Sequence, residues 1–331
     1  MKFSIGNVEI PNQVILGPMA GVSDLPFRLL CHEQGAGLVC MEMVSAKAIV
    51  YENRGTMDLM QTVPEEGKVS LQLFSHEPEF LAAAIDKIEG NHFDILDINM
   101  GCPVPKITGN GEGSALMKDP HLIEELVRAA VTHTHRPVTV KLRKGYDDQH
   151  LNAVECAKAA EAGGASAVAV HGRTRPQMYS GRADWEAIAE VVDAVSIPVI
   201  GNGDVTDGSS AERMLKDTGC AAVMVARGAQ GNPWVFRQIV SYLETGEEYE
   251  KPSRREVVRM ILRHAQLQKE LKGERTAMRE MRKHVGWYLT GFPGASQLRN
   301  KINTVSTLEE LEELLRREFP YALQGTDARS H

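Results

Sequence analysis

The segment Ile95-Leu96-Asp97-Ile98-Asn99-Met100-Gly101-Cys102-Pro103 joins a short, mostly apolar run to a sharp corner. Residues 95–98 are predicted to form a strand, Gly101 permits a tight turn after it, and Pro103 cannot continue a strand ladder. The thiol of Cys102 is therefore expected to lie on a loop at the end of the strand, facing a pocket. Residues 103–117, which contain three glycines, are predicted to form a lid over this cysteine.

Seven further runs resemble residues 95–98, because they are short and mostly apolar without alternation, as expected for parallel strands buried on both faces. They cover residues 14–17, 38–41, 69–73, 138–142, 167–170, 198–201 and 222–225. Helical patterns separate most of them, so the sequence predicts an α/β fold, a TIM (β/α)8 barrel. A doubly wound open sheet is the alternative, but it would require a Gly-x-Gly-x-x-Gly turn after the first strand, which is absent. Residues 3–10 are predicted to form a hairpin at the barrel floor.

The pattern changes at residues 246–252, which are polar and end in a helix-start signal. Beyond this segment only helical patterns occur, over residues 254–271, 274–289, 294–303 and 307–317. We therefore expect three parts: a barrel domain (1–245), a C-terminal all-helical bundle domain (252–320) and a disordered tail (324–331).

The charge is distributed unevenly along the chain, which has a net charge of −7. Residues 251–301 carry 13 Lys and Arg against 4 Asp and Glu, whereas residues 302–331 carry −3 and the remaining 250 residues −13. A basic segment on an acidic body indicates contact with a polyanion, and a solvated helix surface is the equally weighted alternative.

Other features limit the class of protein. No segment reaches the roughly 20 apolar residues of a membrane span, and the amino terminus has no signal-peptide core, so a cytoplasmic protein without membrane contact is expected. The five cysteines are scattered and contain no Cys-x-x-Cys pair, which argues against a disulfide framework or a metal site.

In a TIM barrel the chemistry lies at the carboxyl ends of the strands. Lys141 and Arg143 alternate with apolar residues on a central strand, where a positive charge needs an anionic or polar partner. Glycines and Arg227 at the ends of the last two strands indicate a phosphate site. His171 is either a hydrogen-bonded barrel histidine or a cofactor contact, which its position beside the phosphate strands favours. Gln72 and Lys141 are suited to the pyrimidine edge of a flavin.

Cys102 has three interpretations: a structural thiol, a nucleophile or a proton donor. A nucleophile needs a nearby base or a lowered pKa, and the sequence shows no Cys-His signature. A proton donor needs only a protonated thiol, and an unperturbed cysteine has a pKa of about 8.5. A protonated cysteine that faces a flavin suits a reaction in which hydride arrives from one side and a proton from the other.

Several motifs resemble those of the bacterial tRNA-dihydrouridine synthases, particularly the B-type subfamily. They are Pro18-Met19-Ala20-Gly21-Val22-Ser23-Asp24, residues 97–103, Val170-His171-Gly172-Arg173-Thr174-Arg175, Gly201-Asn202-Gly203-Asp204, and Arg279-Glu280-Met281-Arg282-Lys283-His284 followed by Trp287-Tyr288. The resemblance extends over nearly the whole chain. One departure is Ala226-Arg227-Gly228, where the family usually has Gly-Arg, so the methyl group of Ala226 is expected to shift a phosphate contact.

The resemblance implies an enzyme that reduces uridine in tRNA to 5,6-dihydrouridine with FMN, which NADPH reduces. Reduced FMN would deliver hydride to carbon 6 of the uracil, and Cys102 would protonate carbon 5. The implied FMN contacts are Pro18, Met19, Ala20, Gln72, Lys141, His171, Asn202, Gly203, Asp204, Ala226 and Arg227. The predicted substrate contacts are Asn99, which would hold the flipped-out base, and Arg143, Arg173, Arg279, Arg282 and Lys283.

Two alternatives from other classes remain. The first is an FMN-dependent dihydropyrimidine- or dihydroorotate-type oxidoreductase that acts on a free base and has no need of the helical domain. The second is a non-catalytic RNA-binding protein that would lack a bound yellow flavin. Under the main hypothesis the basic helices bind tRNA phosphates through one face that carries Arg275, Arg279, Arg282 and Lys283. The protein is expected to be a monomer with no obligatory protein partner.

Overall fold

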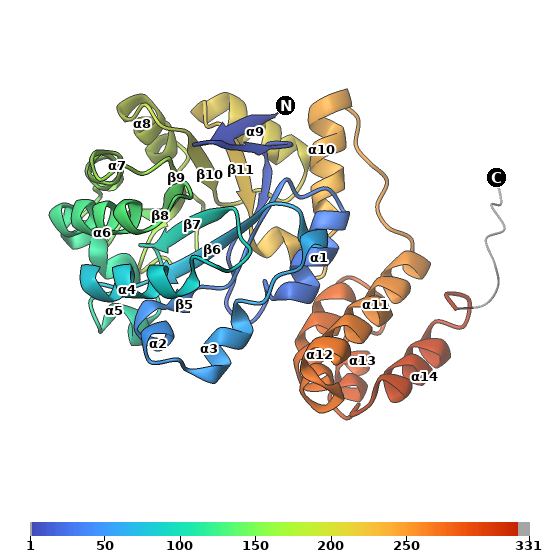
Figure 1. Cartoon of the computed structure of the whole chain (residues 1–331). Helices are drawn as coiled ribbons and strands as arrows, with labels where there is room; N and C mark the ends of the chain where they lie inside the picture. Colours follow the sequence, from blue (N-terminus) through green and yellow to red (C-terminus); the bar gives the residue numbers. More distant parts are fainter. Residues whose placement is uncertain (1, 324–331) are drawn as a thin grey trace. The chain divides into compact units, whose positions relative to one another are not determined.

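The computed structural model describes residues 2–323 (Figure 1). These residues form two compact units, one of residues 2–228 and 235–248 and the other of residues 229–234 and 249–323. The second unit is thus built from two separate stretches of chain. The sequence suggested a single boundary near residues 246–252 and gave no sign that residues 229–234 belong with the helices. The tail expected at 324–331 lies outside the described residues.

The first unit is a closed barrel of eight parallel strands, which confirms the predicted TIM barrel. The strands are β3 (Val14–Leu16), β4 (Leu38–Cys40), β6 (Val69–Phe74), β7 (Ile95–Asn99), β8 (Val138–Gly145), β9 (Ala167–Thr174), β10 (Val199–Asn202) and β11 (Ala222–Val225). Each strand pairs with the next one, β4 pairs with β6, and β11 pairs with β3, so the barrel has no open edge. The two-residue β5 (Val44–Ser45) adds only a short pairing with β6.

The predicted hairpin closes one end of this barrel. Strands β1 (Phe3–Ile5) and β2 (Val8–Ile10) pair in antiparallel register. Ile5 and Ile10 are fully buried and share an apolar cluster with Leu38 and Ile95, which are the first residues of their strands, and with Ile15 in β3. Because the amino ends of the strands are sealed in this way, only the carboxyl ends are left for polar chemistry.

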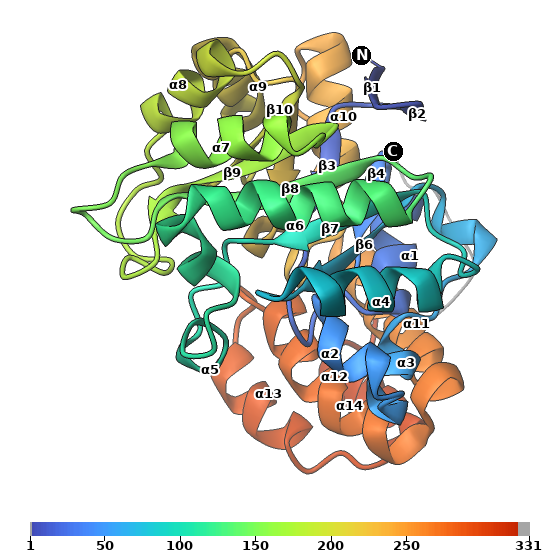
Figure 2. The ribbon, with the colours of Figure 1, turned by 60° about the vertical axis from the view of Figure 1, so that its left-hand side comes forward.

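Helices cover the outer face of the barrel, as Figure 2 shows for α4, α6, α7 and α8. The longer ones are α1 (Leu25–Glu33), α4 (Pro78–Ile88), α6 (Pro120–His133), α7 (Ala153–Ala162), α8 (Glu186–Ala194), α9 (Gly208–Thr218) and α10 (Val235–Thr245). Helix α6 begins where the sequence predicts. The Asp119 carboxylate accepts a hydrogen bond from the N–H of Leu122, and Pro120 occupies the first turn. Shorter pieces are α2 (Ala46–Val50), α3 (Arg54–Leu59), α5 (Pro105–Thr108) and the 3-10 turns η1 (Pro64–Glu66), η2 (Gly113–Lys118) and η3 (Arg227–Ala229).

A buried ion pair ties α1 to η1. The Nε of Arg28 lies 2.5 Å from Oε2 of Glu66, and both side chains are at most 1% exposed. Arg28 also donates to the carbonyls of Ser23 and Gln61, and Glu66 accepts the N–H of Val63. Every polar group of the pair therefore has partners, as a buried charge requires.

The second unit contains α11 (Arg254–Lys272), α12 (Glu274–Tyr288), α13 (Ala295–Ile302) and α14 (Leu308–Glu318). Helix α11 packs on α12 and α14, and α12 packs on α13. Residues 229–234 join them: a side chain at Gly231 would collide with the backbone of Trp287 and Tyr288, and Trp234 meets the Tyr288 ring edge to face at 6.1 Å. None of the described helices combines the length and the apolar character needed to cross a membrane.

We predict that Glu66→Ala lowers the free energy of unfolding by about 3–5 kcal/mol, because it leaves the buried guanidinium of Arg28 without its counter-charge. The control is Glu212→Ala, which removes an exposed pair with Lys216 on α9 and should cost at most about 0.5 kcal/mol. Urea unfolding followed by circular dichroism measures both. Equal midpoints for the two variants would contradict the prediction.

Candidate active site at the carboxyl ends of the barrel strands

The polar residues that the sequence singled out meet at the carboxyl ends of β6 to β10. Strand register pairs Gln72 with Asp97, Asn99 with Lys141, and Arg143 with His171. These neighbouring pairs form a continuous polar layer above the apolar barrel core. Burial is nearly complete for most of them, since Gln72, Arg143, Asn99 and His171 are each no more than 7% exposed.

A chain of hydrogen bonds connects Asp97 to the backbone of Cys102. The carboxylate of Asp97 accepts from Oγ1 of Thr139 (2.6 Å) and from Nε2 of Gln72 (2.6 Å). Oε1 of Gln72 accepts from Nδ2 of Asn99 (2.8 Å), and Oδ1 of Asn99 accepts from the N–H of Cys102 (2.9 Å). We call these residues the Asp97–Cys102 chain. The sequence analysis assigned no function to Thr139 or Asp97. For Asp97 a signal was available, because a carboxylate on a buried apolar strand needs hydrogen-bond donors.

The direction of this chain follows from Asp97. An ionised carboxylate only accepts hydrogen bonds, so Gln72 must turn its NH2 group toward it and its oxygen toward Asn99. Burial raises the pKa of Asp97, while the bonds from Gln72 and Thr139 and the charge of Lys141 act in the opposite direction. Two donors on one carboxyl group match the ionised form.

Cys102 is fixed from several sides. Arg143 donates from Nε to the carbonyl of Gly101 (2.7 Å), and the N–H of Ser114 donates to the carbonyl of Cys102 (3.0 Å). Gly113 has a φ of +59°, and a Cβ there would lie 2.8 Å from that same carbonyl. Burial raises the pKa of the Cys102 thiol, and the nearby N–H of Val104 and the charges of Arg143 and Lys141 only partly offset this. The thiol is therefore protonated at neutral pH.

The segment expected to be a lid is held down over its second half. Leu116 and Met117 in η2 are buried, and the carbonyl of Met117 accepts from Nδ2 of Asn152 at 2.6 Å. Residues 113–117 are therefore packed in place, and the predicted lid can include residues 103–112 only.

Backbone N–H groups point to an anion site at the ends of β10 and β11. Gly203 and Asp204 have φ values of +127° and +61°, and the second is unusual for a residue with a side chain. Within residues 2–323, the N–H groups of Gly203, Asp204 and Ala226 have no protein acceptor. Such groups next to Arg227 are suited to a phosphate.

The residues after β3 form a tight turn beside this layer. The N–H of Met19 donates to Oγ of Ser23 (2.9 Å), and the N–H of Gly21 donates to a carboxylate oxygen of Glu42 (2.5 Å). Glu42 lies just beyond β4, so this bond joins the ends of two adjacent strands. Pro18 and Ala20 belong to the same turn.

Arg173 has a different position from the one we expected. It is 1% exposed, and its nitrogens bond to the carbonyls of Ser180 and Gly181 and to both carboxylate oxygens of Asp204, at 2.8 and 2.9 Å. Its Nη1 contacts only Nε2 of His171 (3.4 Å) among the described residues, so the assignment of Arg173 as a substrate contact stays a prediction that depends on this one nitrogen. Asp204 turns its carboxylate to Arg173 and to the N–H of Ala183, and its backbone N–H remains for a cofactor.

The site holds more positive than negative charge. Lys141, Arg143, Arg173 and Arg227 surround His171, whose pKa is lowered by burial and by these four cations, so His171 is neutral. Burial and Arg143 lower the pKa of Lys141 to about 8, although Asp97 partly counters them. Nζ of Lys141 donates to Oδ1 of Asn202 (3.0 Å). An anionic ligand would relieve this excess of positive charge.

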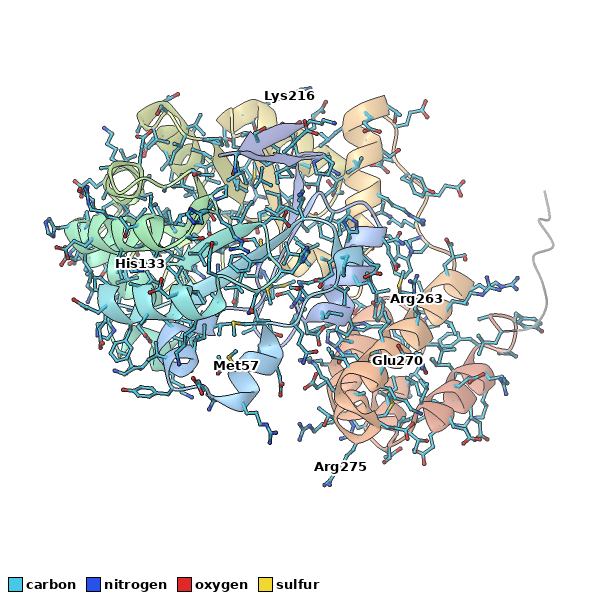
Figure 3. The ribbon with its side chains drawn as sticks, in the orientation of Figure 1. Met57, His133, Lys216, Arg263, Glu270 and Arg275 are labelled. Carbon is cyan, nitrogen blue, oxygen red and sulfur yellow. The ribbon has the colours of Figure 1, made fainter. Side chains whose placement is uncertain are left out.

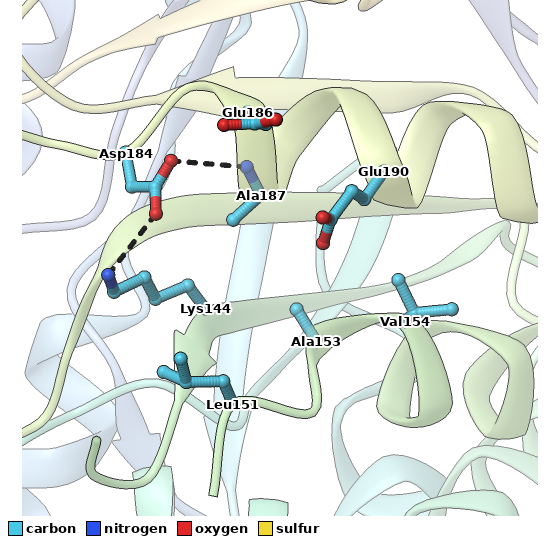
Figure 4. Close-up of a pocket in the computed structure, with 8 residues that line it drawn as sticks. All are labelled: Lys144, Leu151, Ala153, Val154, Asp184, Glu186, Ala187 and Glu190. Atoms are coloured by element: carbon cyan, nitrogen blue, oxygen red, sulfur yellow. Dashed lines mark hydrogen bonds and ion pairs between the residues drawn. The ribbon is translucent and has the colours of Figure 1, made fainter. Parts of the chain in front are cut away.

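Figure 4 shows a separate cavity of about 150 Å³ on the outside of the barrel wall. Lys144, Asp184, Glu186 and Glu190 are among its lining residues, and Lys144 pairs with Asp184 at 3.3 Å. The cavity is below the roughly 300 Å³ of a typical ligand pocket and contains none of the predicted site residues.

The basic residues of α12 divide into two groups. Arg275, Arg279 and Lys283 are exposed, and Figure 3 shows Arg275 projecting from its helix. Arg282 is half-buried and donates to the carbonyl of Val305 (3.3 Å), so it also supports the bundle. Arg299 on α13 is exposed and lies over Gly286 of α12. The sequence analysis did not identify Arg299. The available signal was Gly286, because a glycine within a basic helix indicates that a side chain from another element packs against it.

Known proteins match this chain over most of its length. The family model described as dihydrouridine synthase matches residues 15–324. A "probable tRNA-dihydrouridine synthase" of Rickettsia conorii is 42% identical over 91% of this chain and 92% of its own, and "tRNA-dihydrouridine synthase B" of Pseudomonas aeruginosa is 42% identical over 90% of each.

Among solved structures, the 6-hydroxypseudooxynicotine amine oxidase of Pseudomonas geniculata is similar, with a TM-score of 0.58 and 14% identity. The match covers 73% of this chain and about half (49%) of that longer protein, and it supports the barrel fold alone. The family model and the relatives agree with the motifs at the strand ends: the chain belongs to the dihydrouridine synthase family.

Proposed function

We propose that this protein reduces the C5=C6 bond of uridines in tRNA to give 5,6-dihydrouridine, using FMN and NADPH. The observation that supports this most directly is the protonated thiol of Cys102, held by the Asp97–Cys102 chain at the mouth of a cation-rich barrel. The family and the names of its members favour tRNA over a free base. The proposal places the enzyme in the cytoplasm, with its substrate.

The residues at the strand ends fit FMN. Free backbone N–H groups at Gly203, Asp204 and Ala226 and the charge of Arg227 would hold its phosphate. Lys141 is a half-buried cation at the level of Asn99 and would lie beside the ring, together with Gln72, His171 and Asn202. FMN bound in this way would supply the hydride that adds to carbon 6 of the uracil.

Cys102 acts as the general acid. Carbon 6 of uracil is open to hydride addition because it is conjugated to the carbon-4 carbonyl, and the resulting negative charge is shared with carbon 5. The thiol of Cys102 donates its proton to carbon 5. Arg143 and Lys141 stabilise the thiolate until it regains a proton from water.

Two donors remain for the base itself. Asn99 uses one hydrogen of its NH2 group on Gln72, which leaves one for a uracil carbonyl. Arg143 donates from Nε and Nη1 to backbone carbonyls, and its Nη2 has no protein partner in the described part of the chain. A uracil stacked within tRNA cannot reach these groups, so the base must be flipped out.

The helical unit supplies the longer-range contacts with tRNA. The side chains of Arg275, Arg279 and Lys283 recur every four residues on α12, and Arg299 extends the same charged face from α13. Arg275, Arg279 and Arg299 form no ion pair within residues 2–323, so they can neutralise phosphates. Arg282 would contribute from the edge of this face.

We predict that Cys102→Ala lowers the rate of dihydrouridine formation by about 10²- to 10⁴-fold, because the general acid is lost. Reduction of the bound flavin by NADPH should be unchanged. Single-turnover mass spectrometry of tRNA and bleaching of the flavin absorbance measure the two half-reactions. The control is Cys156→Ala, a buried thiol in α7. Full dihydrouridine formation by Cys102→Ala would contradict the general-acid assignment.

We predict that Asp97→Asn slows tRNA reduction by about 10²-fold, because an amide at this position lets Gln72 reverse and releases Asn99 from the N–H of Cys102. The control is Asp94→Asn at the other end of the same strand, where the carboxylate pairs with Lys68. An Asp97→Asn variant with the wild-type rate would show that the direction of the Asp97–Cys102 chain is unimportant.

We predict that Arg275→Glu with Arg279→Glu weakens tRNA binding and reduces its salt dependence by about one unit of slope for each lost cation. The control is Arg316→Glu with Arg317→Glu on α14, which changes the net charge of the same unit equally. Filter binding at several salt concentrations measures the slope. Equal losses in both variants would show a general charge effect and not a defined face.

A further inference from the structure

A cluster of two cations and one ring lies on the barrel unit and has no assigned function. Nζ of Lys118 is 4.0 Å from the centre of the Tyr146 ring, and Cζ of Arg175 is 4.5 Å from the same centre. We call these residues the Lys118–Tyr146–Arg175 cluster. Lys118 ends η2, Tyr146 follows β8 and Arg175 follows β9, so all three lie at the carboxyl ends of the strands.

The two cations have no counter-charge among the described residues. Because both lie close to one ring centre, they are at most 8.5 Å apart. Neither forms an ion pair with any carboxylate in residues 2–323, and the buried Nε of Arg175 has no hydrogen-bond partner there. The carboxylates next to them in sequence are engaged elsewhere: Asp119 caps α6, and Asp147 binds His150 at 2.7 Å.

This arrangement resembles an anion site more than a structural contact. Two like charges near one ring repel each other, and a buried guanidinium N–H without an acceptor is unfavourable. The ring of Tyr146 attracts both cations and fixes their positions. An anion between or beside them would offset both the repulsion and the missing hydrogen bond.

The cluster is connected to the loop of Cys102 through the backbone. Helix η2, which ends at Lys118, begins beside Cys102, where the N–H of Ser114 bonds to the Cys102 carbonyl. Arg143 bridges the carbonyls of Gly101 and Thr174, and Thr174 immediately precedes Arg175. A phosphate held by the cluster would therefore be held by the same elements that position the thiol.

We propose that the Lys118–Tyr146–Arg175 cluster binds a backbone phosphate of the tRNA strand that carries the target uridine. The proposal rests on the proposed function and adds a contact on the barrel unit to those on α12. A phosphate close to the flipped nucleotide would limit how far the strand can shift, and so would place the uracil against Cys102. The cluster is then expected to affect both tRNA affinity and the rate of base reduction.

The experiment uses the flavin-loaded full chain and an unmodified tRNA transcript. Lys118→Glu and, separately, Arg175→Gln are compared with Lys158→Glu, an exposed lysine on α7 with no ring contact. We expect Lys118→Glu to weaken tRNA binding about threefold to tenfold and to reduce the salt slope by about one, with a smaller loss for Arg175→Gln. Lys158→Glu should change neither. Flavin absorbance and the thermal midpoint check that each variant is folded.

The results separate this inference from the proposed function. If wild-type protein forms no dihydrouridine, the proposed function is wrong and the inference falls with it. If wild-type protein is active and Lys118→Glu binds tRNA like Lys158→Glu, the inference alone is wrong. The phosphates of NADPH are a second possible anion, so the KM for NADPH is measured in flavin reduction without tRNA. An increased KM with unchanged tRNA affinity would assign the cluster to NADPH and overturn the proposal.

Discussion

Asp97 imposes an order on the polar layer of the barrel, because an ionised carboxylate accepts hydrogen bonds and cannot donate them. Two donors, Thr139 and Gln72, satisfy it inside the barrel. The orientation of Gln72 then determines that of Asn99, which in turn holds the N–H of Cys102. A change at the buried end of this series therefore reaches the backbone of Cys102 through side-chain hydrogen bonds alone.

The sequence predicted the barrel well because strands buried on both faces leave a simple pattern of apolar runs, and the eight runs correspond to β3, β4 and β6–β11. It also predicted which strand ends bear polar side chains, including Lys141, Arg143 and His171. It did not predict the partners of these groups. Arg173 turns to Asp204, and Gln72 meets Asp97, because strand register and loop closure bring distant residues together. Residues 229–234 gave no helical or strand signal, so their membership of the second unit was also missed.

Positive and negative charges lie in different regions of the folded chain as well as in different stretches of the sequence. Outside residues 251–331 the chain carries a net charge of −13. Its candidate site nevertheless contains four cations around the neutral His171. Asp97 and Asp204 are the carboxylates that bond to the polar layer of the site. The acidic groups lie mainly on outer helices and loops, where water screens them. Positive charge is thus concentrated where it is desolvated and acts most strongly on an anion. An acidic protein can in this way present a local field suited to a polyanionic substrate.

The contact of Gly231 and Trp234 with Trp287 and Tyr288 has a consequence for how the chain is made. On the ribosome, residues 229–234 emerge about fifty residues before their partners, which at 5–20 residues per second means an interval of several seconds. The barrel strands have been synthesised by then, but Gly231 and the indole of Trp234 stay exposed to water until α12 has been made. The two units are therefore interleaved in synthesis as well as in sequence, and neither corresponds to a single uninterrupted stretch of the gene.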